Sequence, residues 1–216
     1  MSEVTIQSLL ETLCPGVEWQ EMPIVMPLVT GLSVISPDDV TGFGVINPKS
    51  KERRIIIIKN RDWAGNSQFT GITADMYNAN AVDEQDAIHA MKELLRGWGT
   101  CLSYSERLTG CCLTALTLNA SVIPIGNAAR FAELGRVPIG LQQTFKENGQ
   151  VPFYEVAKAI SNTVMPRIIS RLDLERRLKI YYPDNRPELP VVDRTLLRDA
   201  EIWLTCLGMP AVSDIA

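Results

Sequence analysis

Four consecutive isoleucines, Ile55 to Ile58, constrain this chain more than any other feature of its sequence. Successive side chains of a strand point to opposite faces of the sheet, so an unbroken apolar run needs apolar neighbours on both faces. The run therefore predicts a strand that is buried on both sides, either within the fold or within an assembly. Because the turn-forming stretch Asn47 to Ser50 separates it from the apolar pair Val45-Ile46, the two segments are predicted to form a hairpin.

The spacing of apolar residues changes along the chain. Between about residues 19 and 75, short β-branched runs bounded by proline, glycine and asparagine are typical of strands. Between about residues 80 and 208, apolar residues recur at helical spacing. We therefore expect an α+β fold, in which a small N-terminal β-rich region (19–75) packs against a larger C-terminal helical region (80–208). No linker separates a helix-plus-β part (1–78) from a helical part (79–216), so one domain without βαβ alternation is expected over 1–216.

Two local motifs bear on how the chain packs. Gly42-Phe43-Gly44 lies inside a strand pattern, where glycine predicts a bulge or the close approach of another backbone. Ser103-Tyr104-Ser105-Glu106 matches a capping box with Ser103 as the N-cap. The helix that it opens has apolar residues around most of its circumference, which predicts a central, buried helix.

The composition narrows the class of protein. Among the 216 residues, 46% are hydrophobic and 21% are charged, which is typical of a globular chain, and the net charge of −4 argues against a generally basic surface. No signal peptide is expected, because residues 1–14 contain no lysine or arginine, and the most apolar long stretch, Cys111 to Ile125, is too short and too polar to span a bilayer. We therefore expect a cytoplasmic protein, or a virion protein if the source is viral, with reduced cysteines and no membrane partner.

The inventory of catalytic side chains is poor. His89 is the single histidine, and its place on the polar side of a predicted helix favours a solvated surface residue. Cys101 precedes the predicted helix start at Ser103, where the helix dipole would lower the pKa of its thiol, yet no partner base is evident. Cys111 and Cys112 are predicted to be core residues. His89 and Cys101 are thus weak catalytic candidates, no cofactor or metal is expected, and a non-enzymatic role is favoured.

Charge is segregated along the chain. Residues 1–48 contain no lysine or arginine but six acidic residues. Two basic stretches follow, and their candidate partner-binding cations are Lys49, Lys51, Arg53, Arg54, Lys59, Arg61, Arg167, Arg171, Arg176, Arg177 and Lys179. These cations can belong to solvated hairpin and helix faces. Alternatively, the acidic N-terminal arm of one copy docks on the basic hairpin of another, or the cations hold nucleic-acid phosphates.

Three hypotheses account for these features. The first is a non-enzymatic, self-associating structural or assembly protein, a homo-oligomer with the character of a virion, nucleocapsid or phage-tail component. The second is a small enzyme or ligand-binding protein with a pocket between sheet and helices, near Cys101, His89 or the Gly126-Asn127 turn. The third is a protein that binds the RNA or DNA backbone through its basic patches. The poor catalytic inventory and the segregated charge favour the first.

Overall fold

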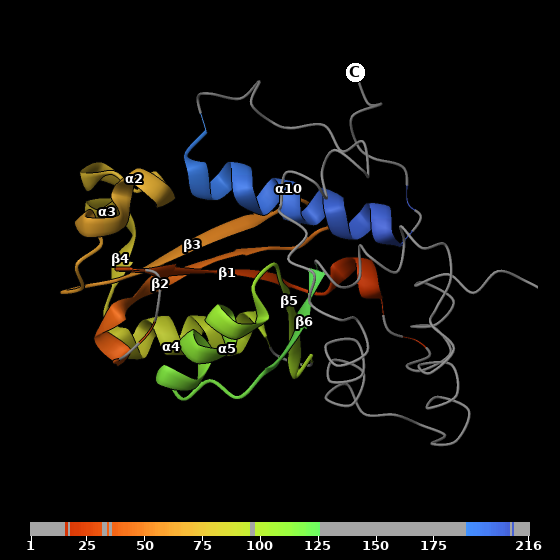
Figure 1. Ribbon diagram of the computed structural model, residues 1–216, viewed down its shortest axis with the longest axis horizontal. Helices are drawn as coiled ribbons and strands as arrows, with labels where there is room; N and C mark the ends of the chain where they lie inside the picture. The colour runs from red at the N-terminus through yellow and green to blue at the C-terminus, as the bar shows by residue number, and fades with distance from the viewer. Residues whose placement is uncertain are drawn as a thin grey trace, which may run out of the picture.

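The computed structural model of this chain describes residues 16, 18–31, 34, 36–95, 98–125, 189–207 and 209. These residues form a mixed six-stranded sheet with helices on both of its faces (Figure 1). The expected mixture of helices and strands is therefore confirmed. Of the helical region expected at 80–208, residues 126–188 lie outside the described part of the chain. None of the helices described is long and apolar enough to cross a membrane.

The strands lie side by side in the order β4-β3-β2-β1-β5-β6. They are β1 (Ile24–Val29), β2 (Val40–Ile46), β3 (Arg53–Ile58), β4 (Ala81–Val82), β5 (Thr100–Ser103) and β6 (Ser121–Pro124). β2 runs antiparallel to β1 and to β3. The pairs β3–β4, β1–β5 and β5–β6 are parallel.

Helices connect the parallel strands. The α-helices of the described residues are α2 (Ser67–Thr70), α3 (Ala74–Asn80), α4 (Glu84–Leu94), α5 (Glu106–Ala115) and α10 (Val191–Cys206). The same part of the chain also forms the 3-10 turns η1 (Trp19–Glu21), η2 (Pro37–Asp39) and η3 (Ala64–Asn66). α4 and α5 cover one face of the sheet, and α10 covers the other (Figure 1).

The strands do not end near residue 78. β4, β5 and β6 all follow it, and β5, α5 and β6 form a βαβ unit, so the expectation that βαβ alternation is absent is wrong. Each of these strands has at most four residues. Such a short strand has too few residues to show an alternating pattern, and its hydrogen-bond partners are distant in the sequence.

The isoleucine run is a strand covered on both faces, as predicted. Ile56 and Ile58 point into the core between the sheet and helices α4 and α5. Ile55 lies on the opposite face, beside the side chains of Val192 and Leu196 of α10. The predicted hairpin is also confirmed, since β2 and β3 pair directly and the Asn47 N–H donates to the Glu52 carbonyl at 3.0 Å.

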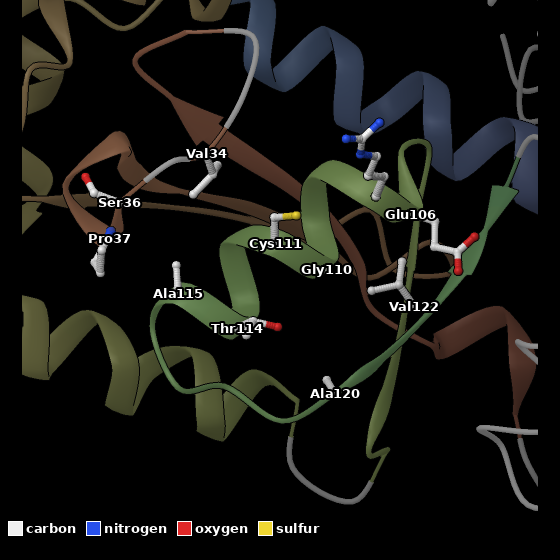
Figure 2. A pocket seen from close by; sticks show the side chains of 11 residues that line it. Val34, Ser36, Pro37, Glu106, Gly110, Cys111, Thr114, Ala115, Ala120 and Val122 are labelled. Carbon is white, nitrogen blue, oxygen red and sulfur yellow. The ribbon is translucent and has the colours of Figure 1, made fainter.

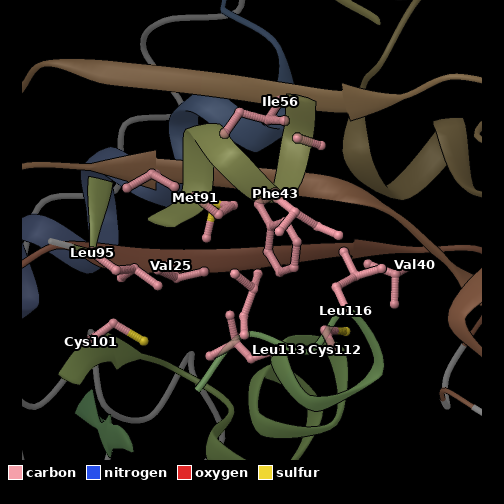
Figure 3. Packing of buried hydrophobic residues seen from close by; sticks show 14 of the residues in the cluster. Val25, Val40, Phe43, Ile56, Met91, Leu95, Cys101, Cys112, Leu113 and Leu116 are labelled. Carbon is pink, nitrogen blue, oxygen red and sulfur yellow. The ribbon is translucent and has the colours of Figure 1, made fainter. Parts of the chain in front are cut away.

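The main hydrophobic core lies between the sheet and helices α4 and α5 (Figure 3). Phe43 and Val25 reach it from the sheet, Met91 from α4, and Cys112 and Leu113 from α5. All five are almost fully buried. Burial of a large apolar side chain stabilises a fold by roughly 1.5–3 kcal/mol, so this layer holds the two helices on the sheet.

The two glycines of β2 allow close approach, as their place in a strand predicts. An ideal Cβ on Gly42 would lie 2.1 Å from the Ile56 carbonyl oxygen, and the φ of Gly42 is +156°. An ideal Cβ on Gly44 would lie 2.8 Å from Cδ1 of Leu196, so this glycine lets α10 pack closely on β2. The indole N–H of Trp203, further along α10, donates to the Trp19 carbonyl at 2.8 Å.

Helix α5 begins two residues later than the capping-box pattern predicts. Ser103 ends strand β5, is buried, and shares a 2.7 Å hydrogen bond with the Thr109 hydroxyl. Ser105 is the N-cap, and its Oγ accepts from the Leu108 N–H. Since Ser103 is used by the sheet, the first free position for a cap is Ser105. Helix α5 buries one side alone, so the prediction of a central, buried helix is wrong.

Candidate functional site

The basic hairpin is largely neutralised by acidic side chains of the same chain. Five of its six cations form ion pairs. The pairs are Lys49–Glu21 (2.8 Å), Lys49–Glu18 (3.0 Å), Arg53–Asp193 (3.1 Å), Lys59–Asp83 (3.6 Å), Lys51–Glu201 (3.9 Å), Arg61–Asp38 and Arg61–Glu84. Arg54 is the exception, because it is exposed and forms no ion pair with a described residue.

Three of these ion pairs, those of Glu18, Glu21 and Asp38, join the acidic N-terminal stretch to the basic hairpin within one chain. Hydrogen bonds from Lys49 to Glu21 and then to Glu18 raise the pKa of Lys49 above its usual value. Burial lowers the pKa of Lys51, because its ammonium group loses contact with water. The attraction of Glu201 compensates for only part of that loss. Water screens exposed ion pairs, so these pairs orient the hairpin more than they stabilise the fold.

The nucleic-acid hypothesis loses most of its support at this hairpin. A cation that already faces a carboxylate must give up that partner before it can hold a phosphate. In the described part of the hairpin, Arg54 alone is exposed without such a partner. The other predicted cations, Arg167, Arg171, Arg176, Arg177 and Lys179, lie outside the described residues.

The environment of Cys101 is the opposite of the one expected for an activated thiol. Cys101 lies within strand β5 and is fully buried in the core. Burial raises the pKa of its thiol to about 12, whereas a reactive cysteine needs a lowered pKa. The sequence pattern predicts a loop at Cys101, because a strand of four residues is too short to show strand periodicity. Within the described residues, no three His, Cys, Asp or Glu side chains gather as metal ligands.

His89 is an exposed residue, as its position on the predicted helix indicates. It lies on the wall of a groove between β3, α3, β4 and α4, which has a volume of about 630 Å³. We call this the edge groove. Its lining includes Arg54, Ile56, Ala79, Asp86, His89 and Glu93. The structure thus brings together three predicted site residues, Arg53, Arg54 and His89, although His89 is 35 positions from Arg54 in the sequence.

The edge groove runs beside a part of β3 that has no strand partner among the described residues. β4 pairs with β3 only at Ile57 and Ile58. β3 begins at Arg53, so its first four residues, Arg53 to Ile56, pair with β2 on one side and are open on the other. An open edge presents backbone N–H and C=O groups that another extended segment can bind. Nothing in the sequence indicates this edge, because it depends on where β4 ends.

A second groove of about 830 Å³ lies along α5 (Figure 2). Val34, Ser36 and Pro37 line it from the segment that follows β1. Glu106, Gly110, Cys111 and Thr114 line it from the helix that follows β5. We call this the α5 groove. Cys111 is exposed here, so the prediction that it is a core residue is wrong, while Cys112 is buried as predicted.

Thiol labelling should separate these cysteines. We expect iodoacetamide at about pH 8 to alkylate Cys111 in the folded protein, because its side chain is exposed. Cys101 should react roughly 1,000-fold more slowly or not at all, because burial raises the pKa of its thiol to about 12. Timed alkylation followed by peptide mass spectrometry measures both rates.

Two variants control the labelling experiment. Cys111→Ser should remove one rapidly labelled site, and Cys101→Ser should remove none. In concentrated urea the two cysteines should react at similar rates, because unfolding exposes both. Fast labelling of Cys101 in the folded protein would contradict its place in strand β5.

The described residues thus form a mixed αβ sheet in which part of β3 has no neighbour on one side, with one groove beside that edge and another along α5. A comparison with models of known protein families gives no match, and neither does a comparison with curated proteins. The two grooves and the charges around them are therefore the features of the described residues that bear on function.

Proposed function

We propose that this protein is a non-enzymatic, self-associating structural or assembly protein. The observation that supports the proposal is the open edge of β3 from Arg53 to Ile56. Proteins usually cover such an edge or protect it with proline or charged side chains, since it otherwise pairs with other chains. The open part of β3 contains no proline, and of its two arginines Arg53 is already paired with Asp193. An edge of this kind suits a contact between copies.

The hairpin presents this edge on a rigid support. Lys49 ties the turn to Glu18 and Glu21 near η1, and Arg53 ties the start of β3 to Asp193 of α10. A binding surface that is already ordered loses less conformational entropy on association. The same ion pairs therefore favour a contact through the backbone edge over one through free cations.

A groove-filling substitution tests the proposal. Ala79 is exposed, lies on α3 and lines the edge groove. We expect Ala79→Arg to weaken self-association by roughly tenfold or more, because a long side chain then occupies the space that an incoming segment needs. Light scattering on a sizing column, over a range of concentrations, compares the measured mass with the 24.0 kDa of one chain.

Asn78→Arg is the matched control for this experiment. Asn78 is exposed on the same helix but does not line the groove, so the substitution adds the same charge outside the groove. The control should associate like the unmodified chain. Equal association of both variants would contradict a role for the edge groove, and a chain that stays monomeric at every concentration would contradict the proposed function.

A second candidate function is the binding of a small ligand in the α5 groove. β1 and β5 are adjacent parallel strands, and the chain continues from them to strands that lie on opposite sides of this pair, β2 and β6. Ligands commonly bind at such a switch point, beyond the carboxyl ends of the strands. A thermal-shift screen of small molecules tests this function, with Cys111-alkylated protein as the control in which the groove is obstructed.

Two further proposals concern domain organisation and compartment. We propose that residues 1–216 form one domain, which is supported by the packing of α10, late in the chain, on β1 and β2. We propose the cytoplasm, or a virion if the source is viral, as the compartment. The free thiols of Cys101, Cys111 and Cys112 support a reducing environment.

A further inference from the structure

We infer that two copies of this chain pair their β3 edges about a two-fold axis at Arg53, so that Glu52 of each copy lies opposite Arg54 of the other. This inference rests on the proposed self-association and specifies its geometry. Three observations support it: the direction of the backbone groups of β3, the opposite charges of Glu52 and Arg54, and the point at which β4 covers the edge.

The direction of the backbone groups follows from the hairpin. The Asn47 N–H donates to the Glu52 carbonyl, so the backbone groups of Glu52 face β2. This direction alternates along an antiparallel ladder, and the N–H and C=O groups of Arg53 and Ile55 therefore face the open edge. The Lys59 N–H, which has the same parity as these two residues, donates to β4 at 2.9 Å and agrees with this assignment.

The unpaired charges of this edge are Glu52 and Arg54. Both side chains are exposed, and neither forms an ion pair with a described residue. Because side chains alternate between the two faces of a sheet, both lie on the α4 side, the face into which Ile56 points. Opposite charges two residues apart on one face are self-complementary. When a second copy runs antiparallel about the residue between them, each charge meets its opposite.

An axis at Arg53 produces a short, defined contact. The outward backbone groups of Arg53 exchange two hydrogen bonds with the same residue of the second copy. Glu52 then lies opposite Arg54 in both directions, as non-hydrogen-bonded pairs, in which side chains are closest. The two Arg53 side chains also face each other, on the α10 side, but each already bonds Asp193 of its own chain at 3.1 Å. Because the contact is short and its ion pairs are exposed, we expect a weak dimer that added salt weakens further.

Other registers between two β3 edges lose these charge pairs. An axis at Arg54 sets two unpaired arginines directly opposite each other, which is destabilising. An axis at Ile55 needs the outward backbone groups of Ile57, which β4 covers. The register about Arg53 uses the part of the edge that lies clear of β4. It ends at Lys51, whose φ of +61° turns the chain out of the strand.

The other edges of the described sheet offer fewer free donors. At the outer edge of β4, which has two residues, the Ala81 N–H already donates to the Tyr77 carbonyl. At the outer edge of β6, the outward-facing residues are Val122 and Pro124, and proline has no N–H. The free backbone groups and the charges therefore favour the same partner for β3, which is the β3 edge of a second copy.

Exchanging the two charges tests the inference. Glu52→Arg places like charges opposite each other twice in the dimer, and so does Arg54→Glu, so each variant should self-associate roughly tenfold more weakly. A mixture of the two variants should recover most of the association, because each charge of one chain then meets its opposite on the other. The chain that carries both changes should recover it for the same reason. Sedimentation velocity over a dilution series measures the association constants.

Arg107→Glu and Asp75→Arg are the matched controls. Both side chains are exposed, form no ion pair with a described residue and do not line the edge groove. Each control should self-associate like the unmodified chain. Their mixture should associate no more tightly, which excludes a general attraction between oppositely altered chains. Circular dichroism of all variants checks that these substitutions of exposed residues keep the fold.

The outcomes separate the inference from the proposed function. Weaker association of both single variants, with recovery in the mixture and a mass that stops at two chains, supports the inference. Unchanged association of the single variants, or no recovery in the mixture, would overturn the inference alone, since the copies would then meet through another surface. A mass that grows beyond two chains would also overturn it, because pairing about a two-fold axis uses each β3 edge once. An unmodified chain that stays monomeric at every concentration would overturn both.

Discussion

Replacing Gly42 with alanine is expected to destabilise the fold by roughly 3 kcal/mol or more. The added Cβ would lie 2.1 Å from the Ile56 carbonyl oxygen and 3.1 Å from the Ile57 Cα, and neither backbone atom can move without opening the β2–β3 ladder. The φ of +156° is also a conformation that residues with a Cβ rarely adopt. Urea unfolding followed by circular dichroism measures the change as a lower midpoint.

Gly110→Ala is the matched control for this glycine substitution. Gly110 lies within helix α5, and an ideal Cβ there would have no neighbouring atom within 4 Å. Because alanine favours the helical conformation, this variant should be more stable than the unmodified chain by roughly 0.5–1 kcal/mol. A Gly42→Ala variant as stable as Gly110→Ala would contradict the close approach of β2 and β3. The hairpin that carries the open edge would then have a different geometry.

Replacing Trp203 with alanine is expected to destabilise the fold by roughly 3–5 kcal/mol. Trp203 is fully buried on the sheet side of α10, and its indole N–H donates to the Trp19 carbonyl at 2.8 Å. The substitution leaves a cavity between α10 and η1 and removes that donor. Since α10 also covers Gly44 and provides Asp193 to Arg53, its loosening should reduce the order of the β3 edge and weaken self-association as well.

Trp203→Phe separates the packing of this residue from its hydrogen bond. Phenylalanine keeps most of the apolar volume but has no N–H, so we expect a smaller loss of roughly 1–2 kcal/mol. Urea unfolding monitored by circular dichroism is preferable to fluorescence, because the chain has four tryptophans. A loss below about 1 kcal/mol in Trp203→Ala would contradict the packing of α10 on the sheet, since surface substitutions usually have effects of that size.

Much of the local structure is predictable from the sequence. The isoleucine run, the turn at Asn47 to Ser50, and the glycines at 42 and 44 all behave as their patterns predict. Ala87, Ile88 and Met91 form the buried side of α4. These features depend on neighbours within a few residues, where strand and helix periodicity act directly.

The candidate site is much less predictable. Cys101 and Ser103 belong to a strand of four residues that exists only because β1 and β6 lie beside it. Cys111 looks like a core residue in the sequence, because an apolar pattern around a helix does not reveal which side meets the sheet. The charge segregation is visible in the sequence, but whether Glu18 faces Lys49 of its own chain or of a second copy is a question of three-dimensional distance.

The sequence by itself determined the β2–β3 hairpin, the polar side of the helix that carries His89, and the places where two backbones must approach closely. These follow from side-chain periodicity and from the steric properties of glycine, which act over a few residues. Only the tertiary structure decided that the hairpin cations are paired within the chain, that Cys101 is buried and that β4 stops at Val82. Each of these outcomes depends on segments far apart in the sequence. The open edge of β3 is the clearest example, because the number of unpaired residues depends on the length of β4 and not on the residues of β3.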